Sequence, residues 1–372
     1  MRDRLRLVEI NYHHHTEFST PQEVIARHRP SNLVLEAMRE KVHITLVKHA
    51  AFEGVHKEGD LEYRFFKGKN ALFHIPFSTN SFVSSLNPDI VLVQGFIFPV
   101  QVMHLRKKLG KHSRILLQHQ GDRPGGKRQV LQRWTDSAVD AYLFRSKGNA
   151  GEWEQRKIIR DPAKVREIAD ASTWFHRLDK RNSRLATGIK GSPAFIWVGR
   201  LDSNKDPFTV LNAFGEYVKE NPRARLYMHF SGGDLKDEVY SYVAGRHILN
   251  DNVELVGMTE HADLQSWFSA ADYFISASHH EGGSYALVEA MACGCIPIVS
   301  AIAPALQMTG NGEAGFSFRT GDHLDLLQVL RRLETEENSE LSNRVEKYFR
   351  ENLSANAIAL QWYTLLNELR AK

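Results

Sequence analysis

Cysteine is almost absent from this chain of 372 residues, and long apolar runs are absent altogether. The only two cysteines, Cys293 and Cys295, are separated by one residue, a spacing that does not favour a disulfide. With no other cysteine nearby, a metal site on this pair is not expected, and the cysteine content fits a reducing compartment. The longest apolar run, 90–100, contains Gln94 and spans about 11 residues, too few to cross a bilayer.

The chain also lacks an apolar leader and any recognised nucleic-acid module. Its first ten residues are charged and contain no apolar stretch, so we expect no signal peptide and a cytoplasmic protein. Nucleic acid is not an expected partner. Hydrophobic residues make up 42% and charged residues 25%, as in soluble globular proteins. The length predicts two domains of roughly 180 residues.

Charge is distributed unevenly along the chain. Residues 1–190 hold 33 Lys and Arg against 20 Asp and Glu, a net charge of +13. The remainder holds 15 against 24, or −9, which gives +4 for the whole chain. The excess is greatest between residues 101 and 150, with 11 basic and 3 acidic side chains. Such a field is usually a solvated surface, but it also favours anionic partners such as a lipid phosphate or the inner face of a membrane.

Short apolar segments alternate with helical ones in both halves, which predicts an α/β protein with two Rossmann-like domains. A polar segment without periodicity, Arg177–Gly191, is predicted to link the halves. The strands expected in the first half are Leu5–Ile10, Val42–Val47, Leu61–Phe66, Ala71–Ile75, a strand ending at Gly95, Ile115–Leu117, and strands within 139–146 and 164–170. The helices expected there are one from Pro21, interrupted near Pro30, and Phe98–Leu109. In the second half we expect strands at Phe195–Val198, 225–233 and 252–257, a strand ending near Ile275, and strands at Ile296–Val299 and 312–318. The helices expected there begin near Pro207, His261, Tyr285, Asp322, Glu340 and Ser354.

The stretch from Ser276 to Ser300 organises the second half. A strand ends near Ile275, a turn contains Gly283, and a helix follows from Tyr285 to Ala292 with Ser284 as its expected N-cap. The first turn of this helix carries no acidic side chain, although such residues are favoured there. A helix N-terminus without its own anion is a suitable place for a phosphate.

Two carboxylates flank this turn. Glu281 precedes the helix and Glu289 lies inside it; taken alone, such a pair is typical of a solvated turn and an exposed helix face. The whole stretch, however, resembles the donor-binding signature of retaining glycosyltransferases of family 4, in which two glutamates of the same spacing flank a glycine-containing turn. The resemblance implies that Glu281 contacts the donor sugar and Glu289 the ribose hydroxyls. It also implies that the backbone at Gly283, Ser284 and Tyr285 approaches the donor, although the family often has an aromatic residue and then Gly where this chain has Gly283–Ser284.

Three further positions resemble the donor site of the same family. Gly199 and Arg200 follow a predicted strand, and Lys205 lies just before a helix with Asp206 as its expected N-cap. As surface cations Arg200 and Lys205 would be unremarkable, but the resemblance implies that they hold the donor pyrophosphate. The loop at Gly257–Met258 would border the base, mainly through backbone groups.

In the first half, His119 follows a strand and lies at the carboxyl edge of the predicted sheet. A lone histidine there is more often structural, but family members place one beside the donor sugar, so the resemblance implies a catalytic role. Arg123 and Lys127 are candidates for an acceptor phosphate. His14 is a candidate acceptor contact in the polar loop expected at 11–23. Metal binding by His13, His14 and His15 is an alternative to simple hydrogen bonding, and the pair of glycines common in this loop of the family is absent.

The resemblance covers residues 194–320 most strongly and implies the GT-B fold. The expected domains are an acceptor-binding domain at 1–185, a nucleotide-sugar-binding domain at 192–352, and a final helix at 353–372 that crosses back to the first. The expected reaction moves a sugar from a UDP- or GDP-sugar to an acceptor hydroxyl with retention, in the synthesis of a surface polysaccharide or glycolipid. No cofactor or metal is expected, because the chain has no Asp-x-Asp tripeptide and Arg200, Lys205 and the helix N-terminus supply positive charge. The acceptor would be a sugar, a lipid-linked molecule or a phosphate-bearing molecule. A sugar-nucleotide epimerase on this fold and an inactive sugar-nucleotide-binding scaffold are the alternatives.

Overall fold

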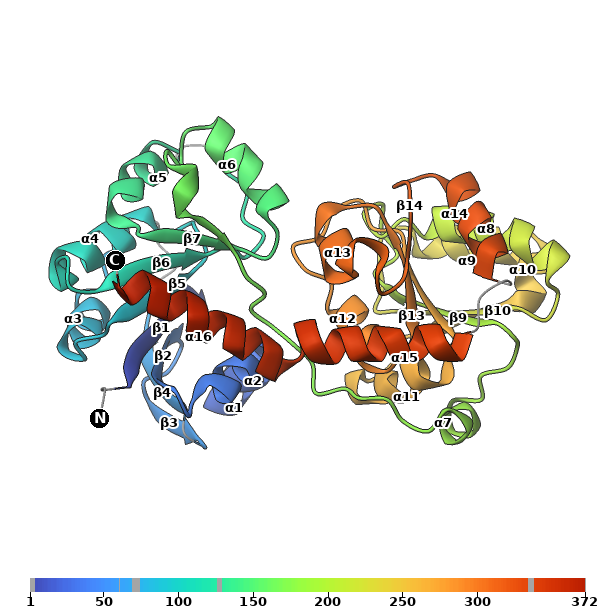
Figure 1. The fold of residues 1–372 in the computed structure, drawn as a ribbon, viewed down its shortest axis with the longest axis horizontal. Helices are drawn as coiled ribbons and strands as arrows, with labels where there is room; N and C mark the ends of the chain where they lie inside the picture. Colours follow the sequence, from blue (N-terminus) through green and yellow to red (C-terminus); the bar gives the residue numbers. More distant parts are fainter. Residues whose placement is uncertain (1–3, 60, 69–73, 126–128, 334–337, 372) are drawn as a thin grey trace. The chain divides into compact units, whose positions relative to one another are not determined.

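The computed structural model describes residues 4–59, 61–68, 74–125, 129–333 and 338–371 (Figure 1). The chain forms two compact units. The first contains Met1–Ser172 and Ala355–Lys372, and the second contains Thr173–Ser354. Each unit is an open sheet covered by helices, as the strand–helix alternation predicted.

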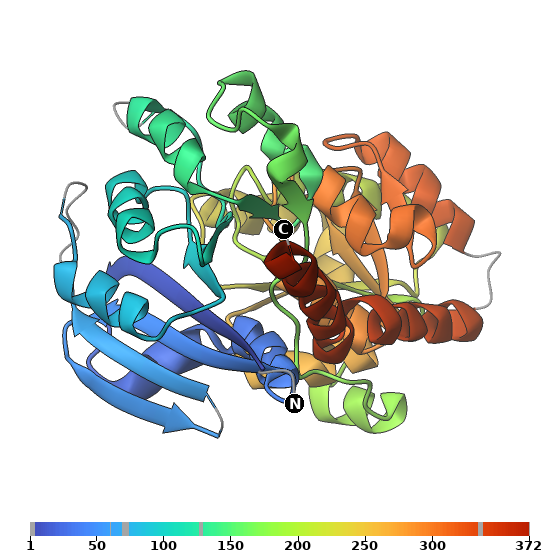
Figure 2. The same ribbon diagram turned by 60° about the vertical axis from the view of Figure 1, so that its left-hand side comes forward.

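The first unit contains an eight-stranded sheet in the order β3-β4-β2-β1-β5-β6-β7-β8. All neighbouring strands are parallel except β3 and β4, which form an antiparallel hairpin at one edge of the sheet (Figure 2). The strands are β1 (Leu5–His15), β2 (Val42–Ala50), β3 (Gly54–Glu58), β4 (Leu61–Lys67), β5 (Ile90–Gln94), β6 (Arg114–Gln118), β7 (Ala141–Phe144) and β8 (Val165–Glu167). The chain order reverses between β1 and β5, and the crevice at the carboxyl ends of such strands is where ligands bind in open α/β sheets.

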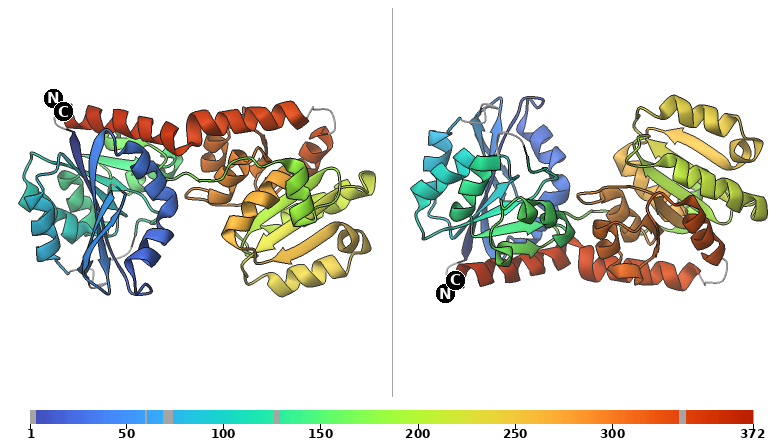
Figure 3. Two further views of the ribbon diagram at one scale, coloured as in Figure 1. Left: turned by 90° about the horizontal axis from the view of Figure 1, so that it is seen from below. Right: turned by 90° about the horizontal axis from the view of Figure 1, so that it is seen from above.

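Helices cover both faces of this sheet, and alternate residues of β1 divide between two apolar clusters. Leu5 and Leu7 lie in one cluster with residues of α1, α2 and α16, while Val8 and Ile10 lie in the other with residues of α4. Figure 3 shows the blue helices on one side of the strands and the teal helices on the other. The helices of this unit are α1 (Pro21–Arg27), α2 (Arg29–Met38), α3 (Phe77–Ser85), α4 (Pro99–Leu109), α5 (Gln129–Thr135), α6 (Gly151–Gln155) and α16 (Ala355–Ala371).

The last helix, α16, completes the core of the first unit, as the GT-B expectation required. Its apolar stripe, including Ile358, Trp362 and Leu366, is buried in the cluster that contains Leu5 and Leu7. The Trp362 indole Nε1 donates a 2.6 Å hydrogen bond to the Ala169 carbonyl oxygen. The structure thus has a final helix, Ala355–Ala371, whose apolar stripe lies in the core of the first unit.

The second unit contains a parallel six-stranded sheet in the order β11-β10-β9-β12-β13-β14. Its strands are β9 (Ala194–Gly199), β10 (Arg225–Phe230), β11 (Val253–Gly257), β12 (Tyr273–Ser276), β13 (Ile296–Ser300) and β14 (Phe316–Phe318). Its helices are α7 (Lys180–Thr187), α8 (Pro207–Glu220), α9 (Lys236–Ala244), α10 (His247–Asn252), α11 (Leu264–Ala270), α12 (Tyr285–Ala292), α13 (Ala303–Met308), α14 (His323–Arg332) and α15 (Asn338–Tyr348). Here the order reverses between β9 and β12.

Several local predictions were wrong. The predicted linker contains helix α7, which Asp179 caps at its start by accepting a 2.8 Å hydrogen bond from the Asn182 N–H, and which Gly188 ends in the left-handed conformation. Because α7 belongs to the second unit, residues 173–185 lie there rather than in the first domain. The weakly apolar sequence of α7 gave no periodic signal.

β1 is also longer than predicted. It continues through the three histidines to His15, pairing with β2 after an irregularity between Asn11 and His14, so this segment is a strand and not a loop. The hairpin strand β3 and the helices α3, α5, α6, α9, α10 and α13 were missed. Of the strand expected at Ala71–Ile75, residues 71–73 lie outside the described residues, and Ile75 is not in a strand. Among the described residues, we find no helix whose length and apolar character would let it cross a membrane.

Candidate active site

Four of the candidate donor residues line one cavity of the second unit. Gly199 ends β9, and Arg200, Lys205 and Met258 line a cavity of about 330 Å³ with it. Met258 lies in the loop after β11 and is 78% exposed. The carboxyl ends of β9, β10 and β11 thus line one concave surface together with the turn before α8.

A network of hydrogen bonds joins the turn before α8 to the loop after β12. The side chain of Asn204 donates to the His280 carbonyl oxygen (3.1 Å) and accepts from the His280 N–H (3.0 Å). Asp206 caps α8 by accepting from the Thr209 N–H at 3.1 Å, and its second oxygen lies 2.9 Å from Nε2 of His279. The two segments are more than 70 residues apart in sequence, and these contacts fix Lys205 relative to Glu281.

Lys205 and Glu281 form an ion pair in this structure. The Ser278 hydroxyl donates a 2.8 Å hydrogen bond to the same Glu281 oxygen, and the Glu281 side chain is 13% exposed. A nearly buried carboxylate held by a cation and a hydroxyl has a defined orientation. Ser278 had no assigned role in the sequence, because its contact with Glu281 arises only from the fold of the loop.

The glycine turn leads into α12 as predicted. Ser284 is the N-cap, with its hydroxyl 3.4 Å from the Leu287 nitrogen, and the first turn has no acidic side chain. Gly283 precedes the cap, and Tyr285, 44% exposed, begins the helix. The positive end of the α12 dipole therefore lies directly after Glu281 in the chain.

Glu289 is buried rather than on an exposed helix face, with only 5% of its surface exposed. His261 Nε2 lies 2.6 Å from Glu289 Oε1 and donates to it. This hydrogen bond, opposed by partial burial of the imidazole and assisted by the carboxylate charge, raises the pKa of His261. The His261 ring also stacks on Phe175, with centroids 5.1 Å apart. Sequence reasoning missed His261, since 28 residues separate it from its partner.

Gly199 is a position where a side chain would be crowded by its neighbours, and its backbone conformation is not one that favours glycine. A Cβ atom at this position would lie 3.1 Å from the Trp197 ring and 3.3 Å from Cγ of Lys205. Trp197 is 1% exposed and confined by the core. The glycine thus leaves room for the stem of the lysine that pairs with Glu281.

In the first unit, His119 follows β6 at the carboxyl edge, as predicted. It is 7% exposed, and its Nε2 lies 2.8 Å from the Asp122 carbonyl oxygen, to which it donates. Its ring packs against Phe144, with centroids 4.9 Å apart, and against Phe96 at 5.4 Å. His119 therefore occupies an aromatic environment within this unit.

Two of the three candidate acceptor residues, Arg123 and His14, lie among the described residues. Arg123 is exposed, and Lys127 lies outside the described residues. His14 pairs with His49 in the strand register. His13, His15 and Glu17 converge, their potential ligand atoms all lying within 4.8 Å of one another, because residues 13 and 15 are two positions apart on a strand.

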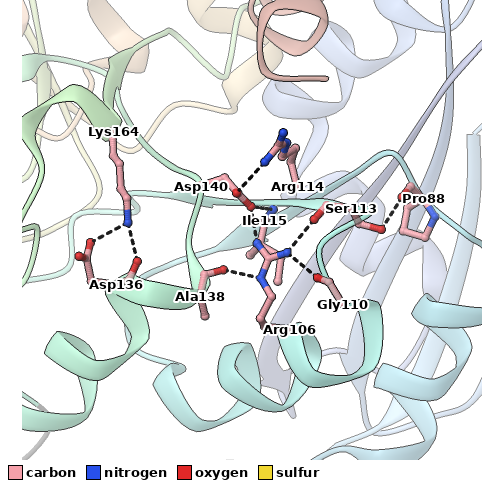
Figure 4. A network of polar contacts seen from close by, with 10 residues as sticks. All are labelled: Pro88, Arg106, Gly110, Ser113, Arg114, Ile115, Asp136, Ala138, Asp140 and Lys164. Atoms are coloured by element: carbon pink, nitrogen blue, oxygen red, sulfur yellow. Dashed lines mark hydrogen bonds and ion pairs between the residues drawn. The ribbon is translucent and has the colours of Figure 1, made fainter. Parts of the chain in front are cut away.

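Part of the basic excess at residues 101–150 has a structural use. Arg106 donates to the carbonyl oxygens of Ala138, Gly110 and Ser113 and pairs with Asp140, which also contacts Arg114 (Figure 4). Lys164, which lies beyond this segment, contacts Asp136 within it (Figure 4). Arg106 joins the end of α4 to the segments that lead into β6 and β7, so Arg106 and Arg114 do not form a free anion-binding surface.

Comparison with known proteins finds a matching family model and related sequences. Residues 179–352 match the family described as glycosyl transferases group 1. A GDP-mannose:cellobiosyl-diphosphopolyprenol alpha-mannosyltransferase of Xanthomonas oryzae pv. oryzae is 29% identical over 120 residues, covering 32% of this chain and 32% of that protein. An alpha-monoglucosyldiacylglycerol synthase of Streptococcus pneumoniae is 28% identical over 173 residues, covering 45% of this chain and 37% of that protein. The chain thus matches only about a third of the length of these relatives.

Solved structures resemble nearly the whole chain. Sucrose-phosphate synthase from Thermosynechococcus elongatus gives a TM-score of 0.71 at 16% identity, covering 99% of this chain and 100% of that one. The E. coli trehalose-6-phosphate structure bound with UDP-2-fluoro glucose gives 0.71 at 12% identity, covering 99% of both chains. At such identities the likeness concerns the fold. The second unit thus resembles the glycosyl transferases group 1, and the chain has the GT-B fold.

Proposed function

We propose that this protein is a retaining glycosyltransferase that transfers a hexosyl group from a GDP- or UDP-sugar to an acceptor hydroxyl. The observation that carries the proposal is the Lys205–Glu281 pair beside the N-terminus of α12, with Glu289 buried one turn inside the helix. A mannosyltransferase relative that uses GDP-mannose supports the GDP-sugar, and a structural neighbour bound with a UDP-sugar analogue supports UDP. Synthesis of a surface polysaccharide or glycolipid is the proposed context.

The chemistry requires stabilisation of a departing diphosphate. Lys205 and Arg200 line one cavity, and α12 directs its positive end toward the loop that carries Glu281. Such preorganised charge stabilises a leaving anion without a metal ion. In the bound state Lys205 would contact the diphosphate while Glu281, still held by Ser278, contacts the sugar. Glu289 would accept hydrogen bonds from the ribose hydroxyls.

Nucleotide binding and transfer test separate parts of this proposal. The protein is melted with GDP, UDP, ADP and CMP in chelator and again with magnesium. A ligand at 100 times its dissociation constant stabilises the fold by about 2.7 kcal/mol. We expect one diphosphate to raise the Tm in chelator. The matching nucleotide-sugars are then incubated with sugar and lipid-linked acceptors, and released nucleotide is measured.

Three variants connect the measurements to residues. Glu281→Ala should abolish transfer and leave nucleotide affinity within about threefold, because its role concerns the sugar. Glu289→Ala should weaken nucleotide binding about tenfold, the equivalent of about 1.4 kcal/mol. Glu216→Ala, on the exposed face of α8, is the control and should change neither. Full turnover by Glu281→Ala would contradict the mechanism, and nucleotide binding without transfer to any acceptor would favour the scaffold alternative.

A further inference from the structure

The face of β1 that packs against α2 and α16 changes from apolar to polar halfway along the strand. We call it the inner face. Leu5 and Leu7 are buried in the core beneath α2 and α16. The next positions on the same face are Glu9, Asn11 and His13. β2 changes in the same way, with Lys48 following Leu46. Since the strands are parallel, both polar halves lie at the carboxyl edge of the sheet, next to the reversal point between β1 and β5.

These polar positions line a cavity of about 250 Å³ that lies entirely within the first unit. Its wall includes Glu9, Asn11, Asn32, Lys48, Gln94 and Asp122. Glu9 and Lys48 form an ion pair at 2.5 Å and are only 4% and 2% exposed. Neither Arg123 nor His14, the acceptor candidates from the sequence, contributes to the lining.

A buried ion pair at this position is not explained by stability. Removing two charges from water costs several kcal/mol per ion, and well-packed apolar residues in their place are often neutral or more stable. Leu5, Leu7 and Leu46 show that the same face supports such residues nearby. Here polar side chains stand where apolar core residues would fit, and they lie beside an open cavity at a sheet reversal point. This combination is typical of a binding site.

The charge of the lining indicates what the cavity accepts. Burial, followed by the nearby Lys48 charge, lowers the pKa of the lining residue His28 to about 2, so this imidazole is neutral. Among the described residues that line the cavity, the Asp, Glu, Lys and Arg side chains are Glu9, Asp122 and Lys48, which gives a net charge of −1. The unit as a whole carries 30 Lys and Arg against 20 Asp and Glu, a net charge of +10. The basic character of the unit therefore does not extend into its cavity.

We infer that this cavity binds an uncharged, hydroxyl-rich ring of the acceptor, a sugar unit, and disfavours a phosphate group. This inference rests on the proposed function, which requires an acceptor hydroxyl. The amides of Asn11, Asn32 and Gln94 and the carboxylates of Glu9 and Asp122 offer the donors and acceptors that sugar hydroxyls use. The cavity is smaller than the roughly 300–1,000 Å³ pockets of drug-sized ligands, which suits a single ring. Any acceptor phosphate would lie outside it.

The test compares neutral and phosphorylated sugars on the full chain. Methyl α-D-mannopyranoside and methyl β-D-glucopyranoside are titrated against mannose 6-phosphate and glucose 6-phosphate by ligand-observed NMR, with and without saturating nucleotide. We expect the glycosides to bind at least about tenfold more tightly than the phosphates. Asn11→Ala should weaken glycoside binding. Phosphates that bind as well as the glycosides, or glycosides that do not bind while the nucleotide does, would overturn the inference.

A charge variant gives a second, independent measurement. Gln120 lines the cavity and is exposed, so Gln120→Lys should fold and should improve sugar-phosphate binding by about tenfold, since a charge-assisted hydrogen bond is added. Gln155→Lys, on the exposed surface of α6 and away from the lining, adds the same charge and should have no effect. If Gln120→Lys and Gln155→Lys changed sugar-phosphate binding equally, the cavity would not be the binding site. Glycoside binding without any nucleotide binding would keep the cavity assignment and reject the proposed donor chemistry.

Discussion

His261 Nε2 donates a hydrogen bond of 2.6 Å to Glu289 Oε1, although 28 residues separate the two in sequence. The carboxylate assigned to the ribose is therefore already held by an imidazole from the loop after β11. We therefore expect His261 to position Glu289.

This hydrogen bond predicts a pH-dependent contribution to stability. Pairing with Glu289 raises the pKa of His261 above its unfolded value near 6.5. The pair therefore stabilises the fold fully below that value and loses its contribution as pH rises through the raised pKa. The Tm difference between the wild type and His261→Gln should be largest near pH 5.5 and should shrink toward pH 9. A difference that does not vary with pH would show that the pair is not coupled to folding.

The close approach of Gly199 to Lys205 predicts a steric variant of the donor site. In Gly199→Ala the new Cβ would lie 3.1 Å from the Trp197 ring and 3.3 Å from Cγ of Lys205, so both neighbouring side chains must give way, Lys205 included. We expect nucleoside diphosphate affinity to fall about three- to tenfold with a small change in Tm, measured by calorimetric titration. Gly151→Ala, where nothing lies within 4 Å of the new atom, is the control. An unchanged affinity of Gly199→Ala for the nucleoside diphosphate would contradict a contact between Lys205 and the diphosphate.

The docking of α16 predicts that the C-terminus determines the stability of the first unit. Trp362 is 2% exposed, and its indole donates to Ala169. Trp362→Ala should destabilise this unit by about 3–5 kcal/mol, and Trp362→Phe should cost less because it retains most of the burial. Hydrogen exchange followed by mass spectrometry should show faster exchange in β1 and α2 and little change in the second unit. Equally faster hydrogen exchange in both units would contradict the prediction that α16 stabilises the first unit in particular.

The exposed end of α4 predicts where an anionic membrane would bind. Arg106 and Arg114 are held by Asp140, but Lys107, Lys108 and Lys111 are exposed. Because α4 leads back to the start of β6, these lysines lie at the amino edge of the sheet, away from the cavity. Reversing all three to Glu should reduce flotation with anionic vesicles, at about 1 kcal/mol per basic residue near the surface, without changing glycoside binding. Flotation that is insensitive to both these changes and salt would exclude this surface.

Much of the second unit could be predicted from sequence, because its information is local. The glycines, the Ser284 cap and the acid-free first turn specify the β12–α12 connection through backbone preferences that act within a few residues. The same is true of Asp206 and α8. Helix α7 was missed because its polar sequence relies on caps and on contacts with α11, where Arg184 donates to the Ala270 carbonyl oxygen.

The sequence by itself determined the two strand–helix halves, the turn that presents Glu281, and the stripe of α16, since hydrophobic period and capping are local properties. Only the tertiary structure decided which polar groups meet. It extended β1 through His15, paired Lys205 with Glu281 and His261 with Glu289, and placed Glu9 and Lys48 on the inner face of one sheet. Such contacts depend on strand order and register, which join residues far apart in sequence. A local sequence pattern therefore does not predict them.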